Sequence, residues 1–226
     1  MIQSEESVTA RRHAGTPIAW CALFAVAMAY VESAVVVYLR ALGPAEGPLA
    51  ALQTVIPPHL LVAEVYREAA TIVMLVSVAA LAGRGFLERF LLFAFCFGIW
   101  DIFYYVWLRA LIGWPSSLLT WDVLFLIPVP WVAPVLAPVI VSAGLVGGSL
   151  WLLARGAREP GAGAAIPRAS WLVSAAGAAL ILLSFTIDAH AALMSGRPTG
   201  FRWWLFGSGV ALGIVALGPG TRRSRT

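Results

Sequence analysis

Six long apolar runs limit what this chain can fold into. They cover residues 17–41, 56–82, 86–111, 121–154, 170–194 and 201–217. An α-helix needs about 20 largely apolar residues to cross the hydrocarbon core of a bilayer. The connecting stretches are too short to form a separate soluble domain. We therefore predict an all-α, polytopic membrane protein with six transmembrane helices, built as one integral membrane domain over residues 1–226.

The composition excludes an ordinary soluble protein. Hydrophobic residues make up 61% of the chain and charged residues only 12%, whereas soluble domains have roughly 45–50% and about 25%. The first run does not read as a cleavable signal sequence, because it is longer than the usual apolar segment of about 7–15 residues and contains Glu32. Cys21 and Cys96 lie in apolar runs without a CxxC motif, and we expect them to be small buried side chains.

The arginines predict an orientation. Most of them cluster at 11–12, 84–89, 155–168 and 222–225, in alternate connections and near the two ends of the chain. The positive-inside rule then places both termini in the cytoplasm (N-in/C-in) of a cell membrane, which we interpret as a bacterial inner membrane. The partner that this pattern indicates is the lipid bilayer, and it gives no support for nucleic-acid binding.

The fourth run carries a row of prolines. Pro130, Pro134 and Pro138 recur every fourth residue, so on a helix they would share one face. Each removes an amide and frees a carbonyl four residues earlier. We predict a proline-kinked fourth helix, whose free carbonyls either bond to neighbouring helices or line a cavity.

Glycine pairs at four-residue spacing mark close helix packing. Gly144 and Gly148 form one such pair, and Gly209 and Gly213 form the other. Small residues at this spacing let two helices approach in lipid. The pairs serve packing within the chain or contact with another subunit, in a homo-oligomer or a larger complex.

Acidic residues gather in the outer half of the predicted spans. Carboxylates are costly inside a bilayer and usually mark function there. The predicted layer holds the acids Glu32, Glu64, Glu68, Asp101, Asp122 and Asp188, together with His59 and His190.

We interpret this layer as a site that is open to the periplasmic side. Carboxylates and imidazole are ligands for divalent metals, so the predicted metal ligands are Glu64, Glu68, Asp101, Asp188 and His190. Residues that would line the substrate pocket are Glu32, His59, Arg67, Tyr104, Tyr105, Arg109 and Asp122.

A structural interpretation remains open beside this one. Arg67 can neutralise Glu64 or Glu68, so the charges would only fix the packing of helices. Thr120 can cap a helix in which Asp122 occupies the first turn. His59 can lie at the membrane interface.

The cofactor remains unknown from sequence. The surplus of acids over arginines in the outer layer calls for a divalent metal ion or protons. Haem held by His59 and His190 has no further signature, and sequence motifs for ATP-driven transport and for standard serine or zinc peptidases are absent.

Three functional hypotheses follow. The first is a metal- or proton-binding membrane enzyme that acts on a lipidic or small apolar substrate. The second is a proton- or cation-coupled transporter that uses the same carboxylates. The third is a structural subunit of a larger membrane complex.

Overall fold

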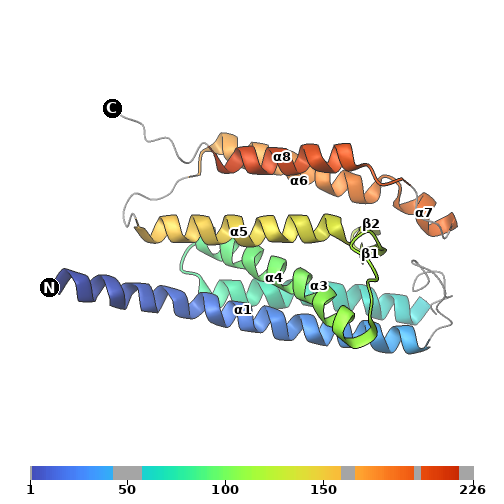
Figure 1. The fold of residues 1–226 in the computed structure, drawn as a ribbon, viewed down its shortest axis with the longest axis horizontal. Coiled ribbons are helices and arrows are strands. Elements are labelled where there is room, and N and C mark those ends of the chain that lie inside the picture. The colour runs from blue at the N-terminus through green and yellow to red at the C-terminus, as the bar shows by residue number, and fades with distance from the viewer. Residues whose placement is uncertain (1, 43–57, 159–165, 196–199, 219–226) are drawn as a thin grey trace. The chain divides into compact units, whose positions relative to one another are not determined.

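The chain is mainly helical (Figure 1). The computed structural model describes residues 2–42, 58–158, 166–195 and 200–218. Their elements follow in the order α1 (Ile2–Leu42), α3 (Pro58–Ala82), α4 (Phe86–Ile112), β1 (Trp121–Phe125), β2 (Trp131–Pro134), α5 (Leu136–Arg158), α6 (Arg168–Thr186), α7 (Ala189–Ser195) and α8 (Trp203–Leu217).

Five helical segments of the described chain are long and apolar enough to cross a membrane. They are Pro17–Ala41, Leu61–Ala82, Phe86–Ile112, Leu136–Ala157 and Arg168–Met194. The apolar helix α8 is shorter. The helical prediction is thereby confirmed and a multi-pass membrane protein is supported, while the sixth span and the N-in/C-in orientation stay predictions.

The predicted fourth helix differs from the structure in its first part. Residues 121–134 form an antiparallel hairpin, in which Trp121 pairs with Pro134 and Asp122 with Ala133. Proline disfavours helical backbone at the residue before it and supplies no amide, and four prolines lie between residues 128 and 138. The helix α5 begins only at Leu136, with Pro138 in its first turn, where an amide is not needed.

The described chain forms two compact units. Unit 1 comprises Met1–Val37, Ala70–Trp114 and Ser142–Gly161, and unit 2 comprises Tyr38–Ala69, Pro115–Val141 and Ala162–Thr226. The prediction of a single domain stays a prediction.

Unit 1 joins parts of α1, α3, α4 and α5. The Trp107 indole on α4 donates to the carbonyl of Val26 on α1 at 3.1 Å. Cys96 lies against the backbone of Cys21, with 3.8 Å from its sulfur to the carbonyl oxygen. Both cysteines are buried, as predicted. A Cβ atom built on Gly98 of α4 would lie 2.6 Å from the carbonyl oxygen of Ser142, so this glycine lets α4 and α5 meet backbone to backbone.

Unit 2 contains the hairpin and a tight pair of helices, α6 and α8, which lie side by side (Figure 1). A Cβ atom on Gly177 would lie 2.7 Å from the carbonyl oxygen of Gly209, and the reverse distance is the same. A core of unit 2 forms from the buried residues Ala133 of β2, Ala137, Phe185 and Phe206.

Candidate functional site

A layer of buried polar side chains links all four helices of unit 1. Its members are Glu32 and Ser33 on α1, Thr71 on α3, Asp101 on α4 and Ser142 on α5, and each is at most 8% exposed. We call this set the buried polar layer. Polar groups that are removed from water need hydrogen-bond partners, and neighbouring helices supply them here.

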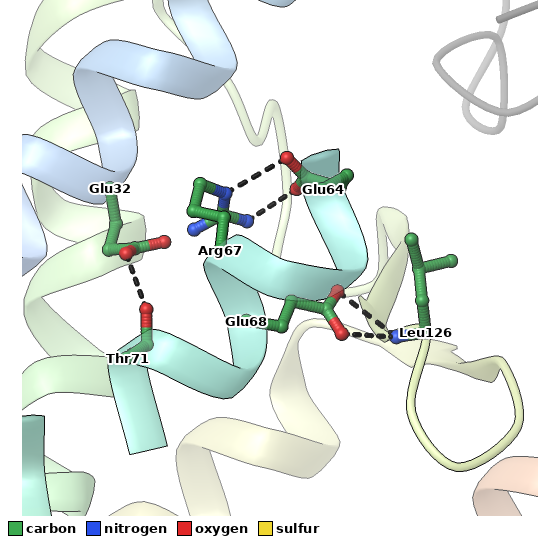
Figure 2. Close-up of polar contacts among 6 residues, drawn as sticks. All are labelled: Glu32, Glu64, Arg67, Glu68, Thr71 and Leu126. Carbon is green, nitrogen blue, oxygen red and sulfur yellow. Dashed lines mark hydrogen bonds and ion pairs between the residues drawn. The ribbon is translucent and has the colours of Figure 1, made fainter. Parts of the chain in front are cut away.

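Each carboxyl group of the buried polar layer accepts a hydrogen bond from a hydroxyl group of another helix. The Thr71 hydroxyl donates to Oε1 of Glu32 at 2.6 Å (Figure 2). The Ser142 hydroxyl donates to Oδ2 of Asp101 at 2.7 Å. Between these two contacts, the Ser33 hydroxyl donates to the carbonyl oxygen of Tyr104 at 3.0 Å. These hydrogen bonds connect α3 to α1, α1 to α4, and α4 to α5.

Aromatic rings continue along α4 from the buried polar layer. The rings of Trp100 and Tyr104 lie 6.4 Å apart, and those of Tyr104 and Tyr105 lie 5.0 Å apart. Tyr105 is buried and also contacts Trp114, at 6.2 Å. The two tyrosines that were predicted to line a pocket therefore belong to one aromatic row that begins beside Asp101.

Two acids predicted as metal ligands form ion pairs in unit 2. Arg67 forms an ion pair with Glu64 in the next turn of α3, and its Nε atom donates to Glu64 at 2.9 Å (Figure 2). Arg202 binds both carboxylate oxygens of Asp188, at 2.7 and 3.1 Å. Bidentate contacts of this kind are typical of the guanidinium group. For these two acids, the charge-neutralising interpretation matches the observed contacts.

Glu68 binds the backbone of the hairpin. Both oxygens of its buried carboxylate accept a hydrogen bond from the amide of Leu126, at 3.0 and 2.9 Å (Figure 2). Leu126 follows β1 directly, so Glu68 supplies an acceptor for a backbone amide at the end of this strand.

The other predicted site residues are more scattered. Asp122 is buried on β1, so the predicted helix with a Thr120 cap does not form there. Arg109 bonds to the carbonyl of Gly113 at the end of α4. His190 is exposed on α7, and the side chain of His59 lies outside the described residues.

The predicted metal site gains no support from this arrangement. Among the described residues, no three His, Cys, Asp or Glu side chains are grouped so that they could hold a metal ion. The four acids among the predicted ligands instead bond to an arginine, a backbone amide or a serine. Glu32 and Asp101 each accept a separate hydrogen bond from another helix of unit 1.

Sequence reasoning missed the partners of these acids. Thr71 could have been found, because it follows Glu64 and Glu68 at helical spacing on α3. Ser142 and Arg202 gave no local signal, since they lie 41 and 14 residues from the acids that they bind. The hydrogen bond from the Leu126 amide to Glu68 could not be expected, because this segment was predicted to be helical and its amides to bond within the helix.

Comparison with known proteins gives no relative. No protein family model matches the chain. No curated protein matches it, and no solved structure does. The functional assignment therefore depends on the chain's own residues.

Proposed function

We propose that this chain is a membrane protein that binds and releases protons at Glu32 and Asp101, and that it acts on a lipidic or small apolar substrate. The observation that carries the proposal is the buried polar layer, in which each of these carboxyl groups is held by a hydroxyl group from another helix. Ionisable groups inside a membrane bundle commonly serve as proton relays.

The hydroxyl contacts of Glu32 and Asp101 support a change of protonation state at these acids. A hydroxyl group can donate to a carboxylate and can also accept from a protonated carboxyl group, so Thr71 and Ser142 suit both protonation states. The aromatic row of Trp100, Tyr104 and Tyr105 supports an apolar substrate, because rings provide apolar contact surface beside Asp101.

Infrared difference spectroscopy between acidic and alkaline buffers tests proton binding. We expect a carbonyl band of a protonated carboxyl group that changes with pH in the reconstituted protein. Glu32→Gln and Asp101→Asn should each remove part of this band, and both keep an oxygen that can accept the hydroxyl hydrogen bond. Glu88→Gln, in the first turn of α4, is the matched control and should leave that part of the band intact.

The same variants separate this proposal from its alternatives. If Glu32→Gln and Asp101→Asn leave the infrared difference unchanged and alter only yield or melting temperature, the proton-binding proposal fails. Uptake that depends on a pH gradient in vesicles and is lost in both variants would identify the coupled transporter rather than the enzyme.

A structural subunit of a larger complex is the second candidate. The ion pairs Arg67–Glu64 and Arg202–Asp188 favour it, because such pairs fix helix packing without chemistry. Its partner would be a second copy or another membrane protein. Contact through Gly144 and Gly148 remains the prediction, whereas the other predicted pair, Gly209 and Gly213, already packs against Gly177 within the chain. A stable partner that co-purifies with the chain would support this function.

We further propose six spans with both termini in the cytoplasm, with α8 as the sixth. The packing of α8 along α6 and the arginine clusters at 84–89 and 155–168 support this orientation. Alkaline phosphatase, which is active only outside the cytoplasm, should be inactive when fused after residue 218 and active when inserted between α1 and α3. The reverse pattern would overturn the orientation.

A further inference from the structure

The hairpin connecting α4 and α5 has the composition of a membrane segment rather than of a water-exposed loop. Residues 113–135 contain a single charged residue, Asp122, and its side chain is buried. The tip reads Leu-Ile-Pro-Val-Pro over residues 126–130. Val129 at this tip is 50% exposed. A loop of this length in water would normally carry exposed charges.

The hydrogen bond to Glu68 fixes the depth of the tip relative to α3. Glu68 is the eighth residue of the candidate span Leu61–Ala82. At 1.5 Å per residue it lies roughly 10 Å along the helix from Leu61. Because the amide of Leu126 lies 2.9 Å from the Glu68 carboxylate, the hairpin tip reaches the same level of the span.

The backbone of the tip is suited to such a position. Non-helical backbone at membrane depth is tolerated only where its polar groups are satisfied within the protein or face water. Pro128 and Pro130 have no amide hydrogen, so they need no acceptor. The amide of Leu126 bonds to Glu68, and the strands pair with each other.

We infer that the β1–β2 hairpin is a re-entrant element of the membrane, whose tip at Pro128 and Val129 contacts lipid acyl chains. Glu68 accepts a hydrogen bond from the Leu126 amide next to this tip. The occupant is lipid rather than a protein partner, because the exposed tip is apolar and lies level with residues inside a membrane-spanning helix. The inference does not depend on the proposed proton binding.

Spin labels report the depth of the tip. In the chain with Cys21→Ala and Cys96→Ala, a nitroxide at Val129→Cys is compared with labels at Tyr66→Cys, exposed on α3 two residues from Glu68, and at Ser116→Cys, exposed before β1. The protein is reconstituted in phosphatidylcholine vesicles. The ratio of collisions with oxygen, which enters the bilayer, to collisions with a water-soluble nickel chelate is expected to match position 66. A ratio equal to that at position 116 would overturn the inference.

An acidic substitution at the tip gives an independent readout. Val129→Asp is expected to lower the melting temperature in lipid nanodiscs much more than Ser116→Asp, because a carboxylate at position 129 would face acyl chains. If both variants melt at the temperature of the unchanged protein, the tip lies in water and the inference fails. Pro128→Cys provides a second label site where Val129→Cys does not fold.

Discussion

Gly98→Val is expected to destabilise the protein by about 3 kcal/mol, at the upper end of the range for overpacked positions. A Cβ atom at this position would lie 2.6 Å from the carbonyl oxygen of Ser142 and 2.9 Å from Cγ2 of Val146. The Val146 methyl can turn away, but the Ser142 oxygen belongs to the backbone of α5. Valine would therefore force α4 and α5 apart.

The same substitution should also disturb a hydrogen bond of the candidate site. Ser142, whose carbonyl oxygen blocks the new side chain, also donates its hydroxyl hydrogen bond to Asp101. Moving α5 would lengthen that contact, so Gly98→Val should also alter the pH-dependent infrared band assigned to Asp101. A melting curve and an infrared spectrum of one sample measure both effects.

Gly144→Ala is the matched control for Gly98→Val. Gly144 lies on α5, and nothing lies within 4 Å of a Cβ atom built there. Alanine should leave the melting temperature equal or raise it, since glycine costs about 1 kcal/mol relative to alanine inside a helix. Equal melting of Gly98→Val and the unchanged protein would contradict the close contact of α4 with α5.

Glu68→Leu is expected to destabilise the protein by up to about 3 kcal/mol. The substitution removes the acceptor for the amide of Leu126, and a buried amide without a partner costs roughly 1–3 kcal/mol. Leucine fills much of the same volume, so lost packing contributes little. Urea or thermal unfolding in detergent measures the change.

Two variants show whether the hydrogen bonds are the cause. Glu68→Gln keeps one side-chain oxygen as acceptor and should recover a large part of the lost stability. Glu64→Leu removes a carboxylate one turn away whose partner is the part-exposed Arg67, and it should cost less than Glu68→Leu because a part-exposed arginine can still be hydrated. Equal losses for Glu64→Leu and Glu68→Leu would contradict the role of Glu68 at the hairpin.

The membrane-spanning helices could be predicted because length and apolarity alone determine them. Pro17–Ala41 in the structure coincides with the run predicted at 17–41, and Phe86–Ile112 differs from its prediction by one residue. The hairpin could not be predicted from hydropathy, because an apolar strand and an apolar helix have the same mean hydropathy. The prolines between residues 128 and 138 disfavour a helix before Leu136. The prediction placed them inside one kinked helix, whereas residues 121–134 form the hairpin.

The contacts of the site residues could be predicted less well than the helices. Depth along a span can be read from the sequence, and Glu32 and Asp101 are both buried in unit 1, where each accepts a hydrogen bond from another helix. The direction of each side chain around its helix depends on packing, which the sequence does not state. Asp188 therefore meets Arg202 rather than another acid, and Glu68 meets a backbone segment that was expected to be helical.

Four acids of the structure share an order in the chain that matters during synthesis. Glu32 bonds to Thr71, Glu68 to Leu126, Asp101 to Ser142 and Asp188 to Arg202. In each pair the acid is made first and its partner emerges from the ribosome later. A nascent helix must therefore enter the membrane before its carboxyl group has the partner seen in the finished protein. Pausing synthesis between acid and partner should prolong contact of that helix with the insertion machinery.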